Sequence, residues 1–163
     1  MNKLIPVASV FILLSLISVA LEQDSGFDAN DPGTWQKNPE QYAAHIKTNP
    51  SDVASCEECY TEYLGNRPAK VEECTDCYAV YLGSDPAKVE NCPGCYAAFI
   101  KADPKQGVRK CLSCFKKGLE TSPELAKDED AVIEYASASK GVNLKGIGTE
   151  QISYAGGVFT TQA

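Results

Sequence analysis

The chain has 163 residues, among them eight Cys, one His, one Trp and one Met. This length allows one ordinary domain or a small repeat array and excludes a multidomain enzyme. The net charge of −7 is poorly matched to phosphate backbones and anionic lipid, so we expect neither nucleic acid nor a membrane as a partner.

The first predicted element is a secretory signal peptide over residues 1–20. Lys3 precedes an apolar run that ends in Ser18-Val19-Ala20, a small-x-small pattern typical of a cleavage site. We therefore expect a secreted, extracellular protein that begins after Ala20. Loss of Lys3 lowers its net charge to −8, and residues 21–30 are expected to form a linker.

A repeat of prolines predicts a helical array over residues 31–122. The prolines recur at spacings of 18 or 19 residues, and five of the six residues before them are favourable helix N-caps. Proline is well suited to the next position, the first of a helix. Each proline therefore predicts a helix start: Pro32, Pro50, Pro68, Pro86, Pro104 and Pro123.

The apolar residues of each unit recur at helical spacing and fall within an arc of about 140°. Each unit therefore predicts one helix of about 14 residues, too short to bury its apolar stripe without a neighbour. The predicted fold is all-α, an array of about five short antiparallel helices. The first unit has Asn38 and Gln41 where the others have Cys, which is typical of a terminal repeat.

The residues after the array predict less regular structure. Residues 123–136 are a possible extra helix, and residues 137–163 are expected to form a flexible tail. Within this tail, Gly156-Gly157 in the segment Ile152 to Thr160 favours a marginal β-hairpin.

The cysteines form four CxxC pairs, and in a secreted segment this rich in Cys they predict disulfides. The pairs are Cys56/Cys59, Cys74/Cys77, Cys92/Cys95 and Cys111/Cys114. Each pair would straddle the midpoint of its helix, so pairs on adjoining antiparallel helices would face each other. This predicts a ladder between helices: Cys56–Cys77, Cys59–Cys74, Cys92–Cys114 and Cys95–Cys111.

Other connectivities remain open among the 105 that eight Cys allow. The main competitor bridges the third and fourth helices, with the second and fifth bridged outside them. Bonding within each CxxC is disfavoured, because in mid-helix the Cβ separation at i, i+3 exceeds that of a relaxed disulfide.

Metal and redox chemistry are alternative roles for the same cysteines. The spacing resembles a four-thiolate zinc site, but an oxidising compartment converts thiols to disulfides first. Haem attachment is excluded, because Tyr or Phe and never His follows each pair. Redox catalysis needs CxxC at a helix N-terminus, which only Cys92-Pro93-Gly94-Cys95 suggests. We therefore expect no metal and no cofactor.

The aromatic residues and the histidine are interpreted as packing residues. His45 occupies the repeat position of Tyr63, Tyr81 and Phe99, and no motif supplies it with a catalytic partner. The tyrosines of the apolar stripe are expected in the core and at its edge, with their hydroxyls reaching solvent.

The predicted function is therefore binding without catalysis, by a secreted disulfide-stabilised helical protein that recognises a protein receptor or target as a signal, defence factor or effector. One alternative is an extracellular structural or coat repeat that self-associates, and another is a four-cysteine metal-binding or thiol–disulfide redox protein. The two-Cys-per-helix pattern is similar in style to the plant alpha-hairpinins. Those carry CxxxC rather than CxxC, so no property is carried over.

Overall fold

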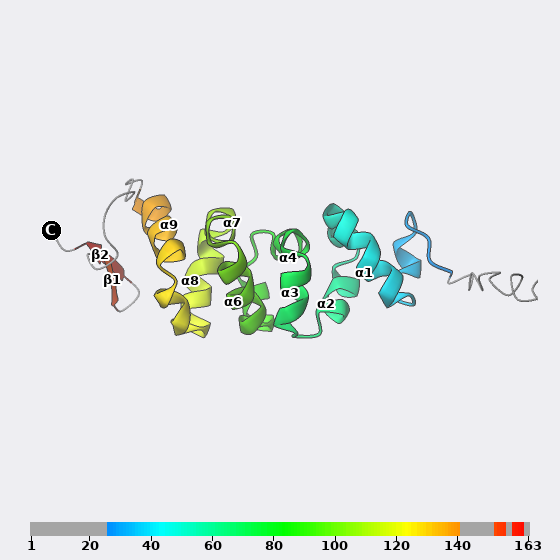
Figure 1. The fold of residues 1–163 in the computed structure, drawn as a ribbon, viewed down its shortest axis with the longest axis horizontal. Helices are drawn as coiled ribbons and strands as arrows, with labels where there is room; N and C mark the ends of the chain where they lie inside the picture. Colours follow the sequence, from blue (N-terminus) through cyan, green and yellow to red (C-terminus); the bar gives the residue numbers. More distant parts are fainter. Residues whose placement is uncertain (1–25, 141–151, 156–157, 162–163) are drawn as a thin grey trace, which may run out of the picture.

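The computed structural model describes residues 26–140 and the segments 152–155 and 158–161. The expected signal peptide, part of the linker and most of the expected flexible tail lie outside the described residues. From Pro32 to Lys140 the chain forms a succession of short helices (Figure 1). This confirms the predicted all-α repeat array with disulfides.

Each repeat unit contains two helices rather than the single helix predicted. In chain order the helices are η2 (Pro32–Thr34), α1 (Pro39–Thr48), η3 (Pro50–Ser55), α2 (Glu57–Leu64), α3 (Pro68–Glu73), α4 (Thr75–Leu82), α5 (Ala87–Asn91), α6 (Pro93–Ala102), α7 (Pro104–Lys110), α8 (Leu112–Thr121), η4 (Pro123–Lys127) and α9 (Glu129–Lys140). The predicted helix starts are confirmed. Five first helices begin at the proline itself, and α5 begins one residue after Pro86.

In the first four units the break lies at the sixth position after the proline, in the fifth unit at the seventh, and in the sixth unit at the fifth. Asn38 in the first unit and the first Cys of the CxxC in the next four units take φ between −131° and −157° and ψ between 61° and 89°. These angles lie outside the helical region, so the residue ends the first helix and becomes the N-cap of the second. The apolar stripe continues through the break, and the periodicity therefore suggested a single helix.

The units stack by packing the first helix of one unit against the second helix of the next. The contacts pair η3 with α4, α3 with α6, α5 with α8 and α7 with α9. Repetition of this contact gives an elongated array in which the units follow one another along the long axis (Figure 1). No described helix has both the length and the apolar character needed to span a bilayer.

The sixth unit repeats the two-helix pattern without cysteine. Its helices are η4 and α9, where the sequence predicted one helix over residues 123–136, and α9 extends to Lys140. Asp128 is the N-cap, and its Oδ1 accepts a hydrogen bond from the Ala131 amide at 3.0 Å. Strands β1 (Ile152–Ala155) and β2 (Val158–Thr161) pair antiparallel in the segment where a hairpin was predicted.

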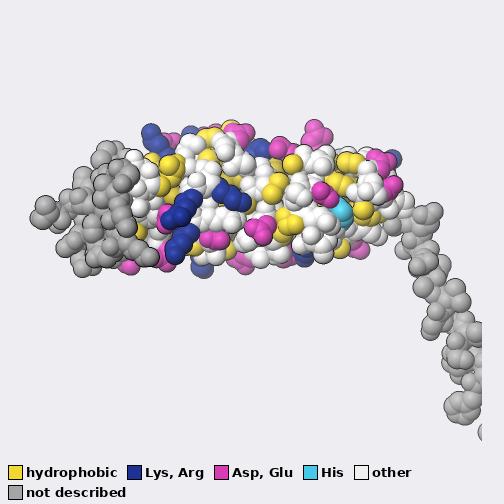
Figure 2. All heavy atoms as spheres, turned by 90° about the horizontal axis from the view of Figure 1, so that it is seen from above, with side chains coloured by type: hydrophobic (Ala, Val, Ile, Leu, Met, Phe, Trp, Pro, Cys, Tyr) yellow, Lys and Arg dark blue, Asp and Glu magenta, His cyan; other side chains and the backbone are white. Residues whose placement is uncertain are grey.

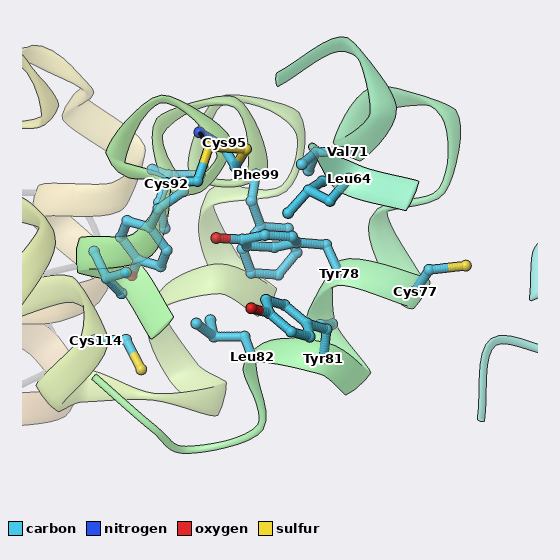
Figure 3. Packing of buried hydrophobic residues seen from close by; sticks show 14 of the residues in the cluster. Leu64, Val71, Cys77, Tyr78, Tyr81, Leu82, Cys92, Cys95, Phe99 and Cys114 are labelled. Carbon is cyan, nitrogen blue, oxygen red and sulfur yellow. Dashed lines mark hydrogen bonds between the residues drawn. A yellow bond between two sulfur atoms is a disulfide. The ribbon is translucent and has the colours of Figure 1, made fainter. Parts of the chain in front are cut away.

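The core is one continuous cluster that runs from Trp35 in the first unit to Val132 in the last. The apolar stripes of all units converge on it, and a valine from the first helix of each of the four middle units is completely buried. Figure 3 shows the packing in the middle of the array, where the rings of Tyr78 and Phe99 lie 5.3 Å apart. This shared core fixes each unit relative to the next.

Candidate functional site

Each CxxC pair lies at the N-terminus of the second helix of its unit. The Sγ atom of the first Cys accepts a hydrogen bond from the amide of the second Cys, at 3.3 Å for Cys56, 3.2 Å for Cys74 and Cys92 and 3.1 Å for Cys111. Sulfur thus replaces the oxygen that usually caps a helix N-terminus. The expectation that only Cys92–Cys95 lies at a helix start is wrong, because all four pairs do.

All four disulfides close within a CxxC pair. The bonds are Cys56–Cys59, Cys74–Cys77, Cys92–Cys95 and Cys111–Cys114, with Cα–Cα separations of 5.1 to 5.3 Å; Figure 3 includes the bond between Cys92 and Cys95. The predicted ladder, Cys56–Cys77, Cys59–Cys74, Cys92–Cys114 and Cys95–Cys111, is wrong.

The physical reason lies in the N-cap and in the stacking. The first Cys has extended rather than helical backbone, so its side chain lies over the first turn and reaches the sulfur three residues on. The mid-helix argument against bonding within CxxC therefore does not apply. Because a first helix packs on the second helix of the next unit, successive second helices also do not face each other in the register that the ladder required.

The four pairs differ in exposure. The second Cys is buried in every pair, with at most 4 % of its surface exposed. Cys56 and Cys74 are partly exposed, whereas Cys92 and Cys111 are only 6 % and 4 % exposed. Solvent therefore reaches the first two disulfides more readily than the last two.

The cysteines are not arranged as a metal site. Every Cys is in a disulfide, and over the described ranges no three or more His, Cys, Asp or Glu side chains are grouped in a way that could hold a metal ion. The zinc interpretation therefore has no support in the described part of the chain.

Four of the stripe tyrosines are buried more deeply than predicted, because their hydroxyls do not reach solvent. The hydroxyls of Tyr42, Tyr60, Tyr78 and Tyr96 are buried and have no hydrogen-bond partner, so the expectation that the stripe hydroxyls reach solvent is wrong for them. Burial is the main cause that raises the pKa of each of these four phenols. They are therefore neutral packing groups.

The aromatic position near the end of each second helix contacts the next unit. Lys70 lies over the ring of Tyr63 at 4.9 Å and Lys88 over that of Tyr81 at 4.8 Å, in cation–π geometry. Glu73 pairs with Lys70 at 3.0 Å and with Lys47 at 2.8 Å. Hydrogen bonds from these two lysines lower the pKa of Glu73 to about 2.

His45 occupies the same repeat position in the first unit. Its ring lies 5.3 Å from that of Trp35 and 5.8 Å from that of Phe27, and its Nε2 is 2.8 Å from Oδ2 of Asp52. The part-buried packing role predicted for His45 matches this environment. The pairing with Asp52 was not predicted, because it depends on how the second unit packs against the first.

A cavity of about 210 Å³ lies between the first two units and adjoins the first disulfide. Its walls include the rings of Trp35, Tyr42 and Tyr63, the buried Cys59 and the carboxylate-bearing Glu62. Arg67 also lines the cavity, and its guanidinium donates a hydrogen bond to the Tyr63 carbonyl oxygen. Sequence reasoning missed this cavity, because its walls come from two units whose relative placement the repeat pattern did not give.

Fold and site together define an all-helical array of two-helix repeats in which a disulfide caps the second helix of four successive units. In comparisons with known proteins, no family model, curated protein or solved structure matches the chain.

Proposed function

We propose that the mature chain is a secreted binding protein that presents its helical array to a protein partner and acts by binding rather than by catalysis. The proposal is supported by the signal-peptide pattern of residues 1–20. It is also supported by the continuous core and by the disulfide at the helix junction of four units, since a preorganised surface loses little entropy on binding.

One surface feature carries the proposal. Residues 26–92 contain twelve Asp and Glu against five Lys and Arg, whereas residues 101–117 contain one Asp against six Lys and Arg. Figure 2 shows Lys and Arg side chains gathered on one face of the C-terminal half of the array. The exposed cations of α6 and α7 are Lys101, Lys105, Arg109 and Lys110, and we call these four residues the basic surface.

The basic surface fits a partner with an acidic face. Arg109 pairs with Glu134 of α9, which leaves Lys101, Lys105 and Lys110 without a partner among the described residues. Opposite potentials across an interface increase the association rate and select the partner. The acidic remainder of the array would repel such a partner and confine it to this surface.

The binding test uses a random-peptide display library selected on the immobilised mature protein. We expect selected peptides to be rich in Asp and Glu, to compete with one another, and to lose binding to the Lys105→Glu/Lys110→Glu variant. Lys37→Glu/Lys127→Glu, a matched reversal of two exposed lysines elsewhere, should retain them. Peptides without acidic bias, or equal binding to both variants, would contradict the proposal.

The secretion test uses the full chain expressed in a eukaryotic secretory host. N-terminal sequencing of protein recovered from the medium should begin at Leu21. Retention of the chain inside the cell with Met1 or Asn2 at its N-terminus would exclude the proposed compartment.

The opposite charges of the two segments also support a second candidate, a structural repeat protein that self-associates end to end. Sedimentation analysis distinguishes the two candidates. Reversible, salt-sensitive growth beyond the monomer supports the structural role, and a monomer at all accessible concentrations favours binding to a different protein.

A further inference from the structure

The Cys56–Cys59 disulfide combines a partly exposed first Cys, an N-cap sulfur and an adjoining cavity. Cys56 is partly exposed, while Cys59 is 4 % exposed. The Cys56 Sγ accepts the Cys59 amide at 3.3 Å. The cavity of about 210 Å³ between the first two units is lined by Cys59, the buried partner of Cys56, so there is open space on the Cys59 side of the bond.

The exposed and buried cysteines have different roles in such a site. An external thiolate attacks the sulfur that it can reach, here that of Cys56, and the buried Cys59 is the leaving group. Once the pair is reduced, the helix N-terminus and the Cys59 amide stabilise negative charge on the Cys56 sulfur. That stabilisation makes Cys56 a good leaving group when the mixed disulfide is resolved.

The side chains around the pair select the reactant. Glu62 and the rings of Trp35, Tyr42 and Tyr63 line the cavity, and aromatic faces attract cations. Arg67 also lines the cavity and offsets the charge of Glu62 there, so the excess negative charge beside the disulfide comes from the first turn of α2. Glu57 and Glu58 lie in the first turn of α2. Lys88 pairs with Glu57, which leaves Glu58 without a cationic partner among the described residues.

We propose that the Cys56–Cys59 disulfide exchanges with an external dithiol that carries positive charge beside its thiols, and oxidises it. One substrate thiolate attacks the Cys56 sulfur, which breaks the Cys56–Cys59 bond and forms a mixed disulfide. The second substrate thiolate attacks the substrate sulfur of that bond and releases Cys56. The substrate gains a disulfide and loses two electrons, and Cys56 and Cys59 gain the electrons and two protons.

This activity goes beyond the proposed binding function and does not depend on the basic surface. The other three pairs are internal controls. Cys74 is partly exposed but does not line this cavity, and Cys92 and Cys111 are buried. The expected order of reduction is therefore Cys56–Cys59 first, Cys74–Cys77 second, and the two remaining pairs last.

The experiment uses the folded mature chain and two dithiol peptides of equal length, one with Lys and one with Glu beside its cysteines. Samples are quenched with acid at intervals, alkylated and mapped by mass spectrometry. We expect Cys56 and Cys59 to be labelled at least tenfold faster than Cys92, Cys95, Cys111 and Cys114, with one peptide disulfide formed per reduced pair. The Lys peptide should react several-fold faster than the Glu peptide, and high salt should remove that difference because it screens exposed charges.

Variants identify the attacked sulfur and the selecting charge. Cys59→Ala leaves Cys56 as a free thiol, so this variant is offered the oxidised form of the Lys peptide. The Cys56 thiolate should break the peptide disulfide and hold one peptide sulfur as a mixed disulfide that acid quenching traps, whereas Cys56→Ala should retain little. Glu58→Lys should remove most of the preference for the Lys peptide, and Glu40→Lys, at an exposed position on α1, should preserve it.

A fourth variant controls for loss of structure. Cys56→Asn/Cys59→Gln reproduces the residues that the first unit carries at these positions, Asn38 and Gln41, and should abolish the fast phase with unchanged helix content. A common reduction rate for all four pairs, a faster reaction at Cys92 or Cys111, or no reduction of the folded chain would overturn the proposal.

Discussion

The hydroxyls of Tyr42, Tyr60, Tyr78 and Tyr96 are buried without a partner, although an unsatisfied buried polar group costs about 1–3 kcal/mol. Phe115 occupies the same repeat position in the fifth unit and is completely buried. An aromatic ring without a hydroxyl therefore fills this position in the core.

Tyr78→Phe should accordingly raise the free energy of unfolding by about 1 kcal/mol, because the substitution removes the unsatisfied hydroxyl and keeps the ring. The matched control is Tyr63→Phe, which removes a hydroxyl that donates to Glu73 at 3.2 Å and should lower stability by about 0.5–1 kcal/mol. Urea denaturation measures both values. A clear loss of stability in Tyr78→Phe would show that its hydroxyl has a partner.

Glu73 gives a prediction about pH. Its pKa is lowered from 4.5 to about 2 by hydrogen bonds from Lys47 and Lys70. A carboxyl whose pKa falls on folding contributes stability above its unfolded pKa, and this stability is lost as the pH falls through the folded value. Between pH 4.5 and 2 the wild type should therefore lose more stability than Glu73→Gln.

Thermal unfolding midpoints across this pH range provide the measurement, with Glu72→Gln as the control at the adjacent exposed carboxylate. Parallel pH curves for the wild type and Glu73→Gln would exclude the pairing with the two lysines. We expect high salt to reduce the difference, because Glu73 is exposed.

At the scale of the helix, the first Cys of each pair acts as an N-cap and the disulfide ties that cap to the first turn. The sixth unit achieves the same geometry with Asp128 and Ala131, without sulfur. The cap and the covalent bond are thus two separable contributions to one helix junction.

Cys74→Asp/Cys77→Ala should therefore keep the helix while it loses about 2 kcal/mol, the chain-entropy contribution of a disulfide that closes so short a loop. Cys74→Ala/Cys77→Ala removes the cap as well and should lose about 1 kcal/mol more. Both variants lack the Cys77 sulfur, so the difference between them isolates the cap. Equal stability of the two variants in urea would show that an N-cap side chain contributes nothing at this helix junction.

Gly118 tests the close approach between α6 and α8. A Cβ at this position would lie 2.5 Å from Cε1 of Tyr96, so Gly118→Ala should cost about 1–3 kcal/mol through overpacking, despite a helix-propensity gain of about 1 kcal/mol. Lys116→Ala, at an exposed position of the same helix, should change stability by less than about 0.5 kcal/mol. Neutral behaviour of Gly118→Ala in denaturation would mean that the two helices are further apart.

The helix starts could be predicted from the prolines and the buried stripe from its periodicity, but the break within each unit could not. One residue with extended backbone leaves the apolar spacing unchanged, and Cys is not among the usual N-cap residues. Two units did contain a sequence sign of the break, because proline directly follows the N-cap position in Asn38-Pro39 and Cys92-Pro93. Because the break was missed, the cysteines were placed in mid-helix and the ladder followed from that error.

On the scale of the whole molecule, covalent bonds and non-covalent contacts stabilise different parts of the array. The disulfides act within units, and the contacts between units are made by packing and by pairs such as Lys88 over Tyr81 and His45 with Asp52. The cavity, the His45 pair and the exposure of Cys56 arise from this stacking, so the sequence pattern of one unit could not have predicted them.

The most direct test of this architecture is tryptic digestion of the unreduced protein followed by mass spectrometry. Cleavage at Lys and Arg places each CxxC in a separate peptide, residues 48–70, 71–88, 89–101 and 111–116. Disulfides within the pairs predict four unlinked peptides, each lighter than its reduced form by two hydrogen atoms. Peptides 48–70 and 71–88 joined to each other, or 89–101 joined to 111–116, would contradict the two-helix repeat capped by its own disulfide.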